Sequence, residues 1–126
     1  MEVREEEMAN TVAVLMRKAP YGSVYTAEGF RSMMGVGVFE LDIRVLFVDD
    51  GVYALVKGQN PAALDMKPLG DGFPTLSEFG VTQFYVHDRS LSERGLAPKD
   101  LVMDVQVVDD AGAARILESC GIVLPF

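Results

Sequence analysis

The sequence is poor in the residues that carry most covalent and metal chemistry. Its 126 residues include one cysteine, Cys120, one histidine, His87, and no tryptophan. A single cysteine excludes an internal disulfide and fits a reducing compartment. A lone histidine with no cysteine beside it does not make a metal site, so neither a metal nor a cofactor is expected.

Long hydrophobic runs are also missing. No apolar stretch approaches the roughly 20 residues that a membrane-spanning helix needs. The N-terminus, MEVREEE, is acidic, whereas a secretory signal begins with basic residues. We therefore expect no membrane association and a cytoplasmic location.

Basic residues are outnumbered by acidic ones. Eleven Lys and Arg residues stand against 19 Asp and Glu residues, which gives a net charge of -8. This charge repels phosphate backbones, so we expect no direct contact with nucleic acid. Residues 1–9 are predicted to be an acidic N-terminal extension, and residues 10–126 a single domain.

Short apolar runs rich in β-branched residues recur along the chain, separated by turn and helix signals. Such runs are typical of strands buried on both faces, as in parallel sheets. The alternation predicts an α/β fold, a three-layer α/β/α sandwich with a five-stranded, mainly parallel sheet. The predicted strands are 10–16, 43–48, 81–86, 105–108 and 122–124, and the predicted helices are 24–40, 52–56, 75–79, 91–94 and one capped by Asp109 that ends near Ser119.

The predicted helix 24–40 is apolar nearly all round. One stripe, predicted to face the sheet, comprises Val24, Ala27, Phe30, Met34, Val38 and Leu41. A helix that is also apolar off this stripe is buried on more than one side, either by another subunit or by a loop of its own chain. We favour the subunit, with an interface set of Phe30, Met33, Met34, Val36 and Phe39.

The segment 59–74 is predicted to be a long, mobile connection. It contains Pro61, Pro68, Gly70, Gly72 and Pro74, which are typical of loops. The short helix after it is predicted to begin with Thr75 as its cap and to close at Gly80.

Ligands of open α/β sheets bind beyond the carboxyl ends of the strands. The residues predicted to line such a cleft are Tyr21, Gly22, Ser23, Asp50, Gly51 and His87. The glycine loop before the first helix could hold an anion, although it lacks the phosphate-loop and dinucleotide patterns. Capping is the favoured role of Asp50 and Asp109, each of which belongs to an aspartate pair at a strand end.

Cys120 and His87 are the two weak candidates for chemistry. A thiolate at Cys120 could carry sulfur as a persulfide. Its spacing from Ala113, Ile116 and Leu117 instead places it on the apolar face of the last helix, which favours a buried, inert thiol. His87 ends the third strand, where it could bind a ligand or move a proton, or be an ordinary loop histidine.

Four segments in order resemble the DsrE/DsrF family, and most closely its DsrF/TusC branch. They are RKAPYGSVYTAEGF, LFVDDGVYALVKGQNP, YVHDRSLSERGL and the ending GIVLPF, which together span most of residues 11–126. The resemblance implies a flavodoxin-like fold and assembly with related DsrE/TusD-type and DsrH/TusB-type subunits in a sulfur-relay complex. Such complexes serve either tRNA thiolation or sulfur oxidation.

The same resemblance implies which subunit carries the sulfur. In the family the DsrE/TusD-type subunit holds the sulfur-accepting cysteine at the end of the third strand, a position that falls at or next to His87 in this chain, which has no cysteine there. The DsrF/TusC type is regarded as structural. We therefore expect a non-catalytic subunit of a persulfide-transfer complex. The alternatives are a persulfide carrier that uses Cys120 and a stand-alone homo-oligomer that binds a small ligand.

Overall fold

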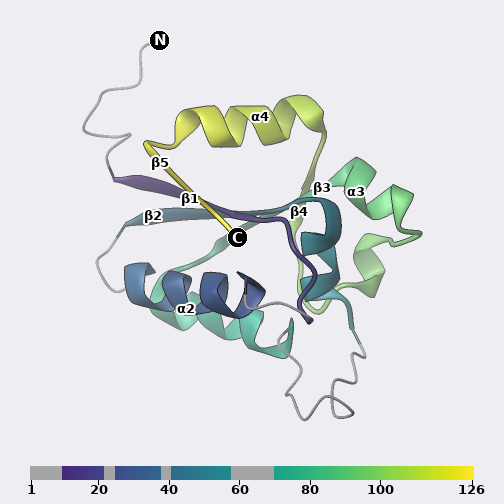
Figure 1. Cartoon of the computed structure of the whole chain (residues 1–126), viewed down its shortest axis with the longest axis horizontal. Coiled ribbons are helices and arrows are strands. Elements are labelled where there is room, and N and C mark those ends of the chain that lie inside the picture. Colours follow the sequence, from purple (N-terminus) through teal and green to yellow (C-terminus); the bar gives the residue numbers. More distant parts are fainter. Residues whose placement is uncertain (1–9, 22–24, 38–40, 58–69) are drawn as a thin grey trace.

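A five-stranded parallel sheet forms the centre of the protein, in the order β4-β3-β2-β1-β5 (Figure 1). The computed structural model describes residues 10–21, 25–37, 41–57 and 70–126. Each neighbouring pair of strands is parallel. The predicted class and five strands are confirmed, with bounds β1 Thr11–Met16, β2 Asp42–Phe47, β3 Gln83–His87, β4 Gln106–Val108 and β5 Ile122–Pro125.

Helices cover both faces of the sheet and complete three layers (Figure 1). The helix α2 (Tyr25–Gly37) and the 3-10 helix η3 (Gly70–Phe79) lie on one face, and α4 (Asp110–Ser119) lies on the other. From β1 to β4 each strand is added on the same side of the one before it, so right-handed connections between them lie on one face of the sheet. The connection from β4 back to β5 lies on the other face. Among the described residues, no helix is long and apolar enough to cross a membrane.

The main hydrophobic core lies between the sheet and α2 with η3. Alternate strand residues point into it, among them Val14, Val45 and Val86, all almost fully buried. A smaller buried group, which includes Ala13, lies on the opposite face of the sheet beneath α4. Cys120 belongs to that second group.

The face that α2 turns to the sheet differs from the predicted one. Met33 is fully buried in the chain's own core, so it offers no surface to another subunit, and its place in the predicted interface is wrong. Thr26 lies on the same face, 1% exposed, and its hydroxyl donates to the carbonyl oxygens of Lys18 and Ala19 at 3.2 Å. The small residues Thr26 and Gly29 let the helix approach β1, which turns Met33 inward.

Phe30 and Met34 are partly buried and pack against the core from its edge. Their role in an interface stays a prediction. The structure does not describe the side chain of Val36, and Phe39 lies outside the described residues, as does the end of the predicted helix.

The predicted loop 59–74 is wrong in its last part, whereas 58–69 lies outside the described residues. Residues from Gly70 onward belong to η3, with Pro74 inside it. Phe73 is fully buried, with its ring edge-on to those of Phe30 and Phe47, at centroid distances of 5.3 and 5.5 Å. Thr75 does not cap the helix but lies inside it. Burial of one aromatic ring outweighs the turn signals of the surrounding glycines and prolines.

Short helices join the remaining strands near the carboxyl edge of the sheet. They are η1 (Asp49–Leu55), α3 (Asp88–Glu93) and η4 (Pro98–Asp100). Gly80 and Gly95 adopt φ angles of 83° and 67°, which suit glycine at a helix end, and Gly80 closes η3 as predicted. Asp109 caps α4 as predicted, since its carboxylate accepts the Gly112 N–H at 2.7 Å.

Candidate functional site

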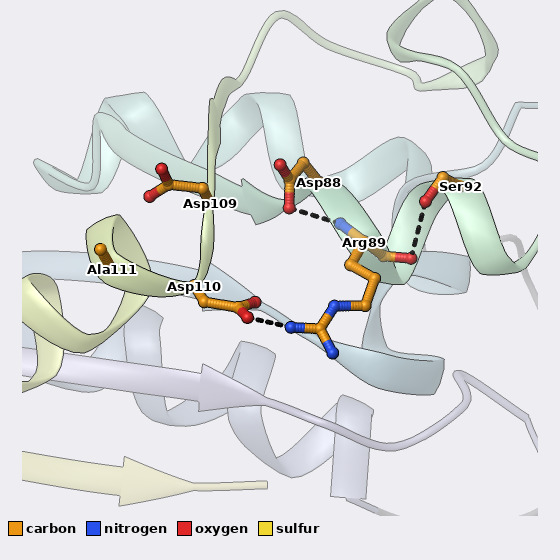
Figure 2. A pocket seen from close by; sticks show the side chains of 6 residues that line it. All are labelled: Asp88, Arg89, Ser92, Asp109, Asp110 and Ala111. Atoms are coloured by element: carbon orange, nitrogen blue, oxygen red, sulfur yellow. Dashed lines mark hydrogen bonds and ion pairs between the residues drawn. The ribbon is translucent and has the colours of Figure 1, made fainter.

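An open cleft lies beyond the carboxyl ends of β3 and β4. The helix after β3 turns toward the face of α2, where Leu91 joins the main core, whereas the chain after β4 turns toward the opposite face. Such a switch of faces between adjacent strands is where open α/β sheets form their ligand crevice. The cleft has a volume of about 690 Å³ and is lined by Asp88, Arg89, Ser92, Asp109, Asp110 and Ala111 (Figure 2).

The polar groups of this strand-end cleft are bound to one another. The Arg89 guanidinium pairs with Asp110, and the Asp88 carboxylate accepts the Arg89 backbone N–H at 2.6 Å (Figure 2). Asp109 is engaged in capping α4, and the Ser92 hydroxyl donates to the Arg89 carbonyl at 3.1 Å. The cleft therefore holds three carboxylates against one guanidinium, with each of these groups already partnered.

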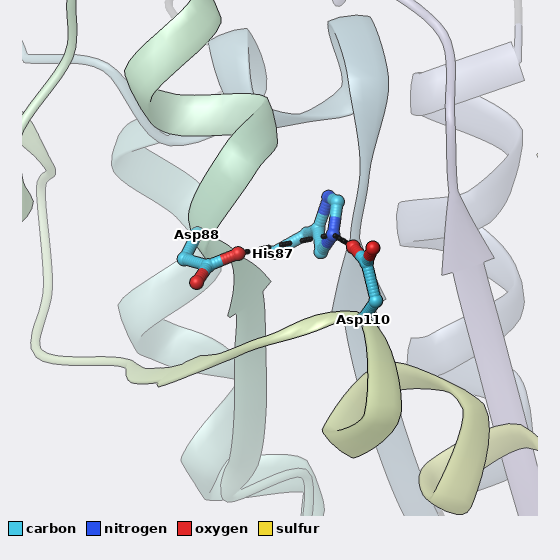
Figure 3. A group of neighbouring side chains, drawn as sticks. All are labelled: His87, Asp88 and Asp110. Carbon is cyan, nitrogen blue, oxygen red and sulfur yellow. Dashed lines mark hydrogen bonds and ion pairs between the residues drawn. The ribbon is translucent and has the colours of Figure 1, made fainter.

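His87, at the end of β3, lies beside Asp88 and Asp110 and is not part of the cleft lining (Figure 3). Its Nε2 is 2.5 Å from the Asp110 carboxylate, and its Nδ1 is 2.7 Å from the Ser90 hydroxyl. Because a carboxylate only accepts, Nε2 carries the hydrogen. In the neutral ring Nδ1 then accepts from Ser90. The Ser90 oxygen in turn accepts the Asp49 N–H at 2.9 Å, so a continuous chain of hydrogen bonds links the ends of β2, β3 and β4.

A serine, a histidine and an aspartate in hydrogen-bonded order resemble a nucleophilic triad. In such a triad the hydroxyl must face the substrate. Ser90 is only 2% exposed, and its oxygen is held by both Asp49 and His87. The arrangement therefore orders the strand ends rather than activating a nucleophile.

His87, Asp88 and Asp110 also form the one group of possible metal ligands found among the described residues (Figure 3). Their ligand atoms lie within 4.8 Å of one another. A cation there would have to displace the hydrogen on Nε2 and compete with the Arg89 guanidinium for Asp110. The geometry is better suited to an internal network of charges, and the prediction of no metal stays a prediction.

Asp50 does not cap η1, so that part of the prediction is wrong. It lies inside the helix, and its carboxylate accepts from Nε and Nη2 of Arg94 at 3.1 and 3.0 Å. The guanidinium also lies 5.9 Å from the centre of the Tyr53 ring. Asp50 thus links the C-terminal end of α3 to η1. It lies beside the cleft and does not line it.

Gly51 has a steric reason for being glycine. A Cβ atom added there would lie 1.9 Å from the carbonyl oxygen of Met16, at the end of β1. η1 can therefore approach β1 only without a side chain at this position. Tyr21 is half-buried on the loop after β1, while Gly22 and Ser23 lie outside the described residues.

Ser90, Arg89 and Asp110 have a larger part in the network than the sequence indicated. One signal for Ser90 was available, because His87 and Ser90 are three residues apart at a helix start, a spacing at which side chains meet. The contact between His87 and Asp110 had no local signal, since 23 residues separate them.

Cys120 lies at the other end of the sheet from this cleft. It follows α4, just before β5 begins to pair with the start of β1, and it is 6% exposed. No thiol lines the strand-end cleft among the described residues.

These features define a small three-layer α/β protein of the flavodoxin-like type, with a polar cleft at a switch point of its sheet. Within that class, the chain belongs to the DsrE/DsrF-like family, whose sequence model matches residues 10–126.

Individual relatives agree with this membership. "Protein TusC homolog" of Pseudomonas aeruginosa is 36% identical over 111 residues, which cover 88% of this chain and 93% of the relative. "Intracellular sulfur oxidation protein DsrF" of Allochromatium vinosum is 34% identical over 134 residues, which cover 95% of this chain and 98% of the relative. The crystal structure of the ychN protein from E. coli matches with a TM-score of 0.77 and 22% identity over 92% of this chain and 98% of that one, a likeness of fold.

Proposed function

We propose that the chain is a non-catalytic, structural subunit of a cytoplasmic sulfur-relay complex in which other chains carry the persulfide. The burial of Cys120 at the end of the sheet remote from the cleft is the observation that carries this proposal. Two relatives support it by name, a TusC homolog and a protein of intracellular sulfur oxidation.

Persulfide transfer needs a thiolate that can reach a sulfane sulfur atom. Reactive cysteines are partly exposed and lie in electropositive surroundings. Cys120 is buried, and His87 stands where the resemblance places the sulfur-accepting cysteine of the DsrE/TusD type. A chain of this kind would shape the surroundings of a partner's cysteine rather than accept sulfur.

The partners in this proposal are DsrE/TusD-type and DsrH/TusB-type chains. The family resemblance implies two settings, tRNA thiolation and sulfur oxidation, and the name of the DsrF relative mentions the second. Transfer of sulfur between protein thiols is the step that we propose for this chain's complex in either setting.

Two surfaces are suited to hold such partners. On α2, Tyr25 is 49% exposed, and Phe30 and Met34 are only partly buried. The edge strand β5 exposes Ile122 and Val123, which are 46% and 40% exposed. Native proteins usually cover or blunt an edge of this kind, because its free backbone groups recruit other strands.

Coexpression with the two partner types, followed by native mass spectrometry, tests the proposal. We expect a mixed assembly that contains this chain, and we expect Ile122→Lys to weaken it. Ala114→Lys, which adds the same charge on the exposed side of α4, is the matched control and should leave the assembly intact. Partners that assemble fully without this chain, while it associates only with itself, would contradict the proposal.

A further inference from the structure

The helix α4 leaves part of its sheet face uncovered. On the strands β2, β3 and β4, this part of the face carries Arg44, Tyr85 and Gln106, all polar. Between these side chains and α4 lies an open pocket of about 320 Å³, to which α4 contributes Arg115 and Ser119. Below we call it the α4 pocket.

The charge of the α4 pocket is opposite to that of the chain. Its described lining contains two arginines and no carboxylate, although the chain has a net charge of -8. Val108, Gly112 and Ile116 supply the apolar part of the wall. The other polar groups of the lining are uncharged: the Tyr85 hydroxyl donates to Gln83, the Ser119 hydroxyl donates to the Ile116 carbonyl, and Gln106 adds an amide.

Arg44 is only partly satisfied by the protein. Its Nη1 donates to the Ser119 hydroxyl at 2.9 Å, and its Nη2 donates to Asp42 at 3.2 Å. Its Nε is buried and has no hydrogen-bond partner. Buried donors are rarely left unpaired in native proteins, so this N–H calls for an explanation.

Arg115 is exposed at the rim, and no ion pair or hydrogen bond of its side chain occurs among the described residues. Asp42 forms its ion pair with Arg44 and accepts a hydrogen bond from Gln83. It therefore does not neutralise Arg115. The α4 pocket therefore keeps an uncompensated positive charge next to a second, incompletely paired guanidinium.

We propose that the α4 pocket binds a small oxyanion of the sulfate or phosphate class between Arg44 and Arg115. Guanidinium groups bind tetrahedral oxyanions through N–H donors; Arg115 offers its whole guanidinium, and Arg44 adds its positive charge and the hydrogens that Ser119 and Asp42 leave free. This site lies apart from the strand-end cleft and does not depend on the sulfur-relay proposal.

Titration of the full chain with sodium sulfate, followed by NMR, tests the site. Sodium chloride holds the ionic strength constant. We expect saturable shifts in the amide signals of α4. Arg115→Gln should weaken binding about tenfold, since a charge-assisted pair is lost. Arg31→Gln is the matched control, because it removes an exposed arginine from α2, and it should change the affinity by less than about twofold.

A second variant separates the geometry of Arg44 from its charge. Arg44→Lys keeps the positive charge beside Asp42 but lacks the planar fork, so it should also bind sulfate more weakly than the wild type. Three outcomes would overturn the proposal: shifts that do not saturate, equal weakening by Arg31→Gln and Arg115→Gln, or full affinity in Arg44→Lys.

Discussion

The strand-end cleft and the α4 pocket lie on one sheet and differ in how their polar groups are satisfied. In the cleft, Asp110 pairs with both His87 and Arg89, while Asp88 and Asp109 accept backbone N–H groups, so each polar side chain already has a partner within the protein. In the α4 pocket, one guanidinium has a buried N–H without a partner, and the other has none of its side-chain donors paired within the described residues. The polar groups of the cleft, where the fold would place a ligand, thus already have partners within the protein. The unpaired hydrogen-bond donors lie in the α4 pocket, on the face of the sheet.

Disrupting the close contact between η1 and the end of β1 should have the largest effect on stability. Gly51→Ala would put a Cβ atom 1.9 Å from the backbone oxygen of Met16, and neither backbone can yield easily. We expect a loss of about 3–5 kcal/mol in the free energy of unfolding, measured by denaturant titration.

Gly35→Ala is the control for this substitution. A Cβ atom at Gly35 meets nothing within 4 Å, and the residue lies in the last turn of α2. Here we expect a gain of about 0.5–1 kcal/mol from helix propensity. Equal effects of the two substitutions would show that the close approach to β1 is not what requires glycine.

Removal of the Ser90 hydroxyl tests whether the network of the cleft is structural. Ser90→Ala leaves the part-buried Asp49 N–H and the Nδ1 of His87 without their partner. We expect a loss of about 1–3 kcal/mol in thermal or denaturant unfolding. Ser92→Ala, on the same helix but exposed, should stay within about 0.5 kcal/mol of the wild type. A Ser90→Ala protein as stable as Ser92→Ala would contradict a structural role.

The smallest effect on stability is expected in the α4 pocket. Arg44→Met keeps the inner, apolar part of the side chain and removes the guanidinium with its unpaired Nε–H, while Asp42 retains its bond to Gln83. We expect a change below about 1 kcal/mol. A loss above about 2 kcal/mol would mean that Arg44 holds the fold together, as the cleft residues do.

The centre of the sheet was the most predictable part, because β1 is buried on both faces, whereas β4 and β5 at the edges are largely exposed. Uninterrupted apolar runs mark such strands, and all five predicted strands are present to within a few residues. Helix faces were harder, because the sequence of α2 is apolar nearly all round. Its orientation is set by the small residues Thr26 and Gly29, which pack closest to the sheet.

The internal partners of the cleft depend on strand order, which the sequence did not reveal. His87 and Asp110 meet because β3 and β4 are neighbours whose chains turn to opposite faces. The burial of Phe73 has a similar cause, since its aromatic contacts lie far away in the sequence, on α2 and β2. Local turn signals around Phe73 could not report either contact.

The central claim, that this chain does not itself carry sulfur, is tested most directly by intact mass. The native protein and its Cys120→Ala variant are incubated with a persulfide-loaded donor that is shown to modify a small thiol. We predict that neither protein gains mass, because Cys120 is buried beneath α4. Addition of one sulfur atom to the wild type but not to the variant would contradict this and make the chain a carrier.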